Sequence, residues 1–169
     1  MYLPFIKVLY EGIKLQALPL SSDKILYRGT RLLNNEIKII SNYLSKRIQG
    51  LPGAIIFSKT FLSFSKEKKI AECFLKSNPS QINNFSKVLF ILDKDDYIDY
   101  SLSTHSDIEQ FSCFPSEKEV LFFPFSSFEI KEIKKSSFND EVLYIIRLLY
   151  LGKYLKEFID DKLFIQKKC

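Results

Sequence analysis

Apolar residues recur every third or fourth position in the first part of the chain, which is the spacing of one helix face. The stretch 5–13 has this pattern after Pro4, a residue suited to a first helical turn, and predicts a helix that ends near Pro19. A second stretch predicts a helix over about 34–49, because glycines at 50 and 53 then interrupt the pattern. Helices are therefore expected early in the chain.

Strands are expected mostly later. A short apolar run, Ile25 to Thr30, predicts a strand that ends at an arginine and a glycine. Short strands at 54–57 and 60–65 precede a helix over about 66–76, and residues 154–164 fit either a terminal helix or a last strand. The inward residues of the helix are predicted to be Ile70, Ala71 and Phe74. The remaining predicted strands are Val88 to Leu92, Val120 to Phe123, Phe128 to Ile133 and Val142 to Leu151. This segregation predicts an α+β fold.

Length and composition bound the kind of protein. With 169 residues, 46% of them hydrophobic, and few Gly or Pro, the chain is expected to form one ordered domain over 1–169. The formal net charge is +5, but the basic residues are scattered and alternate with acidic ones. This pattern favours solvated surface charge over a track for nucleic acid.

Cysteine usage and hydropathy indicate the environment. The three cysteines, Cys73, Cys113 and Cys169, are widely spaced and fit neither a disulfide framework nor a C-x-x-C metal site, which favours a reducing compartment. The apolar amino-terminal stretch contains charged residues and is a poor signal peptide. The apolar run 142–151 is shorter than the roughly 20 residues that span a bilayer. No membrane contact is predicted.

Familiar catalytic sets are missing from the sequence. The single histidine, His105, cannot supply a metal cluster and is predicted to be an ordinary loop residue. Three other features remain: an arginine after a strand, a Ser-Phe-Ser turn before a helix, and a Glu-Lys-Glu entrance to an apolar strand. Each has a plain structural explanation, as a surface ion pair, a helix N-cap and a solvated strand end.

Taken in order, these features resemble the Arg-Ser-Glu class of mono-ADP-ribosyltransferases over residues 5–150. Tyr27 to Thr30 (YRGT) resembles the family's Tyr-Arg-Gly signature. Thr60 to Ser65 (TFLSFS) and the following helix resemble its Ser-Thr-Ser strand and helix, with Phe64 in place of the middle threonine. Phe111 to Phe122 resembles its turn-turn loop, which ends in Glu-x-Glu and a buried strand. Three motifs in the right order carry more weight than any one of them.

The resemblance implies a split β-sandwich of ADP-ribosyltransferase type, with N-terminal helices around an NAD cleft. It implies transfer of ADP-ribose from NAD to a protein arginine with release of nicotinamide, without a metal. A monomer is expected, and the charge pattern and hydropathy predict neither nucleic acid nor a membrane as a partner. The expected location is cytoplasmic, or a host cytosol for a secreted effector. An NAD glycohydrolase and a catalytically silent binding module of the same fold are the alternatives.

Roles for the first two motifs follow from the resemblance. Arg28 offers a planar fork of donors to a phosphate of NAD. Gly29 permits close backbone approach to the nicotinamide amide, and Thr30 belongs to the same cofactor-binding signature. Ser63 is expected to hold the catalytic carboxylate or the ribose in register. Ser65 is either a helix cap or an NAD ligand.

The third motif is expected to carry the chemistry. Glu119 is the predicted catalytic carboxylate, because it would stabilise the positive charge that develops on the ribose as nicotinamide leaves. Glu117, two residues earlier, is expected on the same face of an extended segment, where it would hold the arginine guanidinium and help to remove its proton.

Aromatic residues complete the prediction. Either Phe74 or Phe85 is expected to stack on nicotinamide, and the sequence does not choose between them. Phe111 and Phe114 are expected either on the loop that meets the target protein or in the core. Phe64 points opposite to its serine neighbours on a strand and is expected to pack into the core.

Overall fold

The structure is a computed structural model that describes residues 25–45, 54–76, 84–93 and 105–151. The predicted helix over 5–13, the end of the second helix and the segment 154–164 lie outside the described residues.

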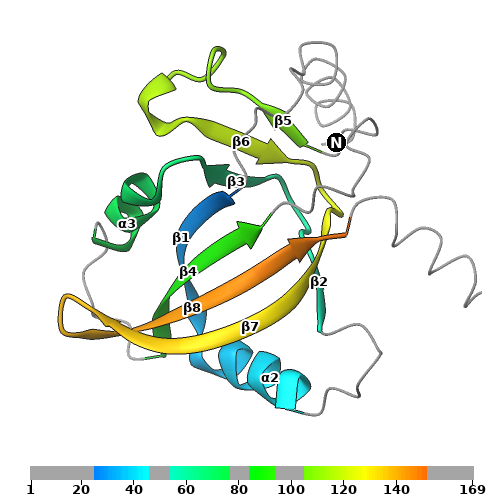
Figure 1. The fold of residues 1–169 in the computed structure, drawn as a ribbon, viewed down its shortest axis with the longest axis vertical. Helices are drawn as coiled ribbons and strands as arrows, with labels where there is room; N and C mark the ends of the chain where they lie inside the picture. The colour runs from blue at the N-terminus through cyan, green and yellow to red at the C-terminus, as the bar shows by residue number, and fades with distance from the viewer. Residues whose placement is uncertain (1–24, 46–53, 77–83, 94–104, 152–169) are drawn as a thin grey trace, which may run out of the picture.

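The described elements form one mixed sheet with two helices (Figure 1). In chain order they are β1 (Ile25–Leu33), α2 (Asn34–Ser45), β2 (Ile55–Phe57), β3 (Leu62–Ser65), α3 (Lys68–Lys76), β4 (Phe85–Asp93), β5 (His105–Asp107), the 3-10 turn η1 (Pro115–Glu117), β6 (Glu119–Phe122), β7 (Ser127–Phe138) and β8 (Glu141–Tyr150). The strand order is β2-β7-β8-β4-β1-β3-β6-β5. The pairing of β4 with β8 is parallel, and the other pairings are antiparallel.

The sheet divides between β1 and β3. These two strands share a single paired position, Tyr27 with Ser65, whereas β1 pairs with β4 along its whole length. Five strands therefore lie on one side of the division, and β3, β6 and β5 lie on the other, as Figure 1 shows. Buried aromatic rings from both parts meet in one core, with Phe64 and Phe122 centroids 5.4 Å apart and Phe122 and Phe128 centroids 5.3 Å apart. A sheet that divides at this point around one core is compatible with the expected split sandwich.

The helices pack into different clusters. Ile37 of α2 is buried in the main core, whereas Ala71 and Leu75 of α3 pack with Leu89 of β4 in a second cluster. Val88, the neighbour of Leu89, belongs to the main core, and because successive strand residues face opposite ways, the two clusters lie on opposite faces of the sheet. Helix α3 therefore lies over the outer face of β1 and β4, next to the division.

Two sequence predictions about burial are wrong. His105 is the first residue of β5, is 4% exposed and stacks on Phe122 with centroids 5.0 Å apart. The segment His105–Asp107 has no apolar alternation, and it is buried because β5 pairs with β6. Phe74 is 52% exposed, and Leu75 takes the inward position on α3 instead.

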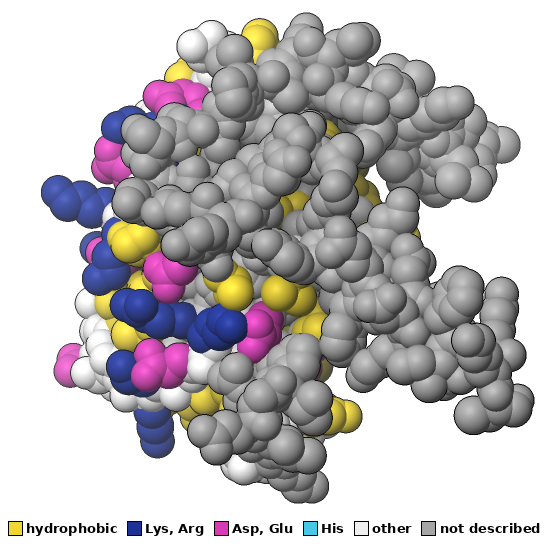
Figure 2. Space-filling model, turned by 45° about the vertical axis from the view of Figure 1, so that its right-hand side comes forward, with side chains coloured by type: hydrophobic (Ala, Val, Ile, Leu, Met, Phe, Trp, Pro, Cys, Tyr) yellow, Lys and Arg dark blue, Asp and Glu magenta, His cyan; other side chains and the backbone are white. Residues whose placement is uncertain are grey.

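Charged side chains of both signs are interspersed on the described part of the face in Figure 2. Ion pairs occur within and between strands: Lys134 pairs with Glu132, both on β7, at 2.8 Å, and Arg147 of β8 pairs with Asp93 of β4 at 3.3 Å. Within the described ranges, no helix has both the length and the hydropathy to cross a membrane.

Candidate functional site

A cavity of about 400 Å³ opens where β1 and β3 part. Its described lining comes from three separate stretches of the sequence: β1, β3 with the following α3, and the stretch from η1 to β6. The lining residues are Tyr27, Arg28, Gly29, Thr30, Arg31, Ser63, Phe64, Ser65, Ile70, Ala71, Phe74, Glu117 and Glu119. The cavity has the size of an ordinary ligand site and combines apolar walls with cationic and anionic groups.

Arg28 connects the two parts of the sheet at this opening. Its Nη1 donates a hydrogen bond to the carbonyl oxygen of Ser63 at 2.8 Å, across the gap that the backbone ladder leaves. Burial lowers the pKa of Arg28, and the nearby carboxylate of Glu119 opposes that shift. A guanidinium stays protonated in proteins and has five N–H donors, so it keeps its charge and has further donors for an anion in the cavity.

Gly29 is required by the packing of α3. A Cβ at this position would lie 1.9 Å from the carbonyl oxygen of Ala71 and 3.1 Å from Cγ of Leu75. The sequence predicted a glycine that allows close backbone approach to a ligand, and the structure gives a second reason, the close approach of a helix. Both Gly29 and Thr30 line the cavity.

Ser65 links β3 to the Glu-Lys-Glu motif. Its Oγ donates to the carbonyl oxygen of Glu117 at 2.7 Å and accepts from the backbone N–H of Glu67 at 3.0 Å. The second contact caps the turn before α3 and agrees with the cap interpretation. The first contact holds the backbone of Glu117. Ser63 lies two residues earlier on the same strand and also lines the cavity.

The two glutamates reach the cavity by a different route from the one predicted. Glu117 is the last residue of η1, Lys118 has a left-handed backbone with φ 47°, and Glu119 begins β6. The segment is therefore not extended, because Pro115 starts a 3-10 turn and Lys118 has a left-handed backbone before the strand begins. Glu119 pairs with Ser65 in the ladder between β3 and β6. Both carboxylates still lie at the cavity.

The aromatic candidates are separated by the fold. Phe74 lines the cavity, whereas Phe85 begins β4 opposite Leu33, five residues along that strand from the position that pairs with Arg28. Phe85 is not among the described lining residues.

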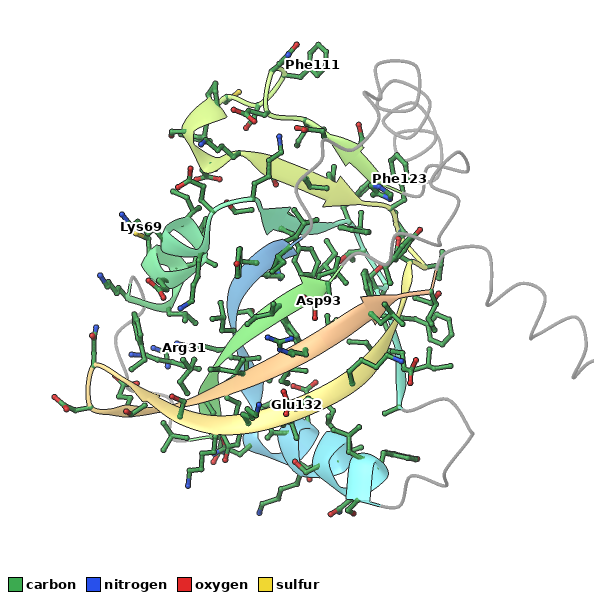
Figure 3. All side chains as sticks on the ribbon, in the orientation of Figure 1. Arg31, Lys69, Asp93, Phe111, Phe123 and Glu132 are labelled. Carbon is green, nitrogen blue, oxygen red and sulfur yellow. The ribbon has the colours of Figure 1, made fainter. Side chains whose placement is uncertain are left out.

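The segment between β5 and β6 carries exposed phenylalanines. Phe111 is exposed and lies at its outer end in Figure 3, and Phe114 is 65% exposed, so neither belongs to the core. Phe64, in contrast, is buried against Phe122 and Phe128, as the sequence predicted.

Arg31 is a lining residue that the sequence reasoning missed. It follows Gly29 by two positions and therefore projects from β1 on the side where α3 lies, as Figure 3 shows. One sequence signal could have identified Arg31: it lies two positions after Gly29 and therefore on the same face of the predicted strand. Directly opposite, Lys87 of β4 is buried and pairs with Glu141 at 3.0 Å. The charge of Lys87 is therefore balanced by Glu141, and Lys87 is not among the described lining residues.

Solved structures of ADP-ribosyltransferases match the chain over most of its length. The Vis toxin from Vibrio splendidus is 20% identical over 86% of this chain and 55% of its own, with a TM-score of 0.57. The fold is that of the ADP-ribosyltransferases. HopU1 of Pseudomonas syringae pv. tomato DC3000 is 19% identical over 87% of this chain and 53% of its own, with a TM-score of 0.56. Plx2a, a toxin from Paenibacillus larvae, is 16% identical over 87% and 69%, with a TM-score of 0.55.

A second structure of Vis contains agmatine and matches with 19% identity and a TM-score of 0.57. The chain spans about 55% of the length of the Vis structure. No protein-family model matches the chain, and no curated protein matches it at a significant level. The described residues contain no group of three or more His, Cys, Asp or Glu side chains arranged to hold a metal ion.

Proposed function

We propose that the protein is an NAD-dependent mono-ADP-ribosyltransferase that modifies arginine side chains of proteins. The observation that carries the proposal is the lining of one cavity by Arg28, Ser63, Glu117 and Glu119, which come from three distant segments of a chain with the ADP-ribosyltransferase fold. NAD is the substrate that matches this combination, because it joins an anionic diphosphate to a cationic nicotinamide through a ribose.

Charge complementarity supports NAD binding along β1. The further donors of Arg28 would bind the diphosphate, and Arg31, which lines the cavity from the opposite, α3 side of the same strand, would add a second guanidinium. The exposed ring of Phe74 offers a face for nicotinamide, which makes it the better candidate than Phe85. Glu119 also lines the cavity and lies close enough to Arg28 for its carboxylate to oppose the lowering of the pKa of that guanidinium.

Glu119 would stabilise the transition state. The bond between the nicotinamide nitrogen and the ribose breaks, its electron pair leaves with neutral nicotinamide, and positive charge develops on the sugar. A carboxylate held against the ribose favours that state over the ground state. Because Glu119 belongs to the ladder between β3 and β6, its backbone is preorganised for this role.

Glu117 would select the acceptor. An arginine nitrogen attacks the anomeric carbon, and a carboxylate beside it accepts the proton that the guanidinium loses. The binding of agmatine, which carries a guanidine group, by the structurally similar Vis supports an acceptor of this kind. Vis and Plx2a are toxins, and we extend the proposal to a toxin or effector that modifies proteins of another cell.

The decisive experiment compares wild type with Glu119→Gln, using Glu72→Gln on α3 as a charge-matched control outside the cavity lining. Nicotinamide release and ADP-ribosylated peptides are measured after incubation of a protein extract with NAD. Loss of a preorganised charge contact predicts a fall in rate on the order of 10² or more for Glu119→Gln. Near wild-type turnover in that variant would refute the assignment.

A second arm tests the acceptor. Glu117→Gln is expected to retain nicotinamide release while modified arginine peptides disappear. A wild-type protein that modifies only serine, threonine or asparagine would contradict the arginine proposal but not the use of NAD. Release of free ADP-ribose without any modified peptide would instead identify an NAD glycohydrolase.

A further inference from the structure

Lys66 lies between β3 and α3, outside the described cavity lining, and its side chain is only 11% exposed. Its Nζ forms ion pairs with Asp107, which is equally buried, and with Glu109 at 2.9 Å. Burial alone would lower the pKa of Lys66, but hydrogen bonds and charge from both carboxylates outweigh it and raise the pKa. Lys66 is therefore charged at neutral pH, and removing its charge would leave the buried carboxylate of Asp107 without its ion-pair partner.

Lys66 contacts both ends of the segment that separates β5 from β6. Asp107 and Glu109 are at the start of this segment, and the backbone N–H of Lys66 donates to the carbonyl oxygen of Lys118 at its end, at 3.1 Å. The start is itself ordered by Asp107, whose Oδ1 accepts from the N–H of Glu109 at 3.1 Å. One residue thus closes a loop of about ten residues at its base.

The two glutamates of the cavity depend on this closure to different degrees. Glu119 is held by the pairing of β6 with β3 and by the N–H of Ile108, which donates to its carbonyl oxygen at 3.0 Å. Glu117 lies in η1, outside the ladder, and its carbonyl oxygen accepts from Oγ of Ser65 at 2.7 Å. Loosening the base of the segment would therefore displace Glu117 before it displaces Glu119.

We propose that Lys66 is a positioning residue that clamps the segment 107–118 and thereby keeps Glu117 in place for the acceptor arginine. The inference rests on the proposed function, whose site it deepens. Without the clamp, NAD cleavage continues at Glu119, but the acceptor is no longer held, so water takes the ADP-ribose instead. Lys66 therefore sets the ratio of protein modification to NAD hydrolysis.

The test replaces Lys66 with Met, which keeps the length of the apolar stem and removes the charge. Misplacement of a reacting group by about 1 Å costs up to 10²-fold, so arginine modification is expected to fall on the order of tenfold or more. The rate of nicotinamide release by Lys66→Met should stay within about twofold of the wild-type rate. Lys66→Arg should restore the ratio, and Lys68→Met, which removes an exposed lysine paired with Glu72 at 3.2 Å, should not change it.

Limited proteolysis needs no NAD and measures directly whether Lys66 holds the segment 107–118 closed. Phe111 is an exposed cleavage site for chymotrypsin, whereas the bond after Phe114 is resistant because Pro115 follows it. Cleavage after Phe111 requires the segment to open locally. Lys66→Met should accelerate cleavage after Phe111 on the order of tenfold, because a buried partner is lost. The double variant with Asp107→Asn should cleave no faster than Lys66→Met alone, since both remove the same ion pair.

The outcomes separate the two proposals. An unchanged ratio of modification to hydrolysis, or an unchanged cleavage rate, in Lys66→Met overturns the clamp. An equal fall of both activities also overturns it, because that would indicate general damage to the fold. A wild-type protein that never cleaves NAD refutes the proposed function, and the chymotrypsin comparison then decides the clamp alone.

Discussion

Replacement of Gly29 by alanine tests how the wall of the cavity is built. A strand interior normally gains from this change, because glycine in a strand is destabilising by roughly 0.5–1 kcal/mol relative to alanine. Here the added Cβ would lie 1.9 Å from the carbonyl oxygen of Ala71 and 2.9 Å from its carbonyl carbon. Strand propensity and packing therefore predict opposite signs for the same substitution.

The magnitude follows from which atoms collide. The contact is with the backbone of α3 and not with the end of a flexible side chain, so the helix must move away from β1 by about 1 Å in a close-packed region. Overpacking of this kind typically costs about 1–3 kcal/mol. That cost exceeds the gain from strand propensity, so we expect Gly29→Ala to be less stable by about 1–2 kcal/mol.

Urea denaturation followed by circular dichroism measures the difference directly. The variant should also release nicotinamide more slowly, because α3 carries Phe74 and Ile70 into the cavity lining. A second substitution, Leu75→Ala, removes the side-chain contact at 3.1 Å and should not rescue the variant. Equal or greater stability of Gly29→Ala, or full rescue by the second change, would show that the helix backbone is not the obstacle.

Two further predictions concern charge. Arg31→Gln should raise the KM for NAD on the order of tenfold with little change in kcat, because Arg31 would bind phosphate groups that take no part in the reaction. An unchanged KM at low salt would contradict this prediction. The hydrogen bond and charge of Lys118 lower the pKa of Glu67. The stabilisation of the folded state by this ion pair is therefore present at pH values above the ordinary glutamate pKa of about 4.3, and it is lost as the pH falls through the lower pKa of Glu67 in the folded protein. The difference in unfolding free energy between wild type and Glu67→Gln should be constant above about pH 5 and vanish in stronger acid; a difference that persists there would refute the pairing.

Local patterns predicted most of the elements near the site. The apolar run at Ile25 predicted β1, and the spacing before residue 76 predicted α3, because a strand or a helix face is defined by neighbours in the sequence. The order of the three motifs predicted an ADP-ribosyltransferase-like fold, which the solved structures confirm. Phe64 was placed in the core from strand alternation alone, and it is buried there.

Contacts between distant segments required the tertiary structure. The burial of His105 comes from the pairing of β5 with β6, and Asp107 meets Lys66 across 41 positions of sequence, so neither leaves a local pattern. Lys118 has a left-handed backbone between the two glutamates that line the cavity. Apolar spacing does not encode such a turn. The sequence by itself determined which side chains carry charge and most of the segments that become strands, with β5 as an exception. Only the fold decided that β1 and β3 part after one shared pair, because strand pairing depends on residues brought together from far along the chain.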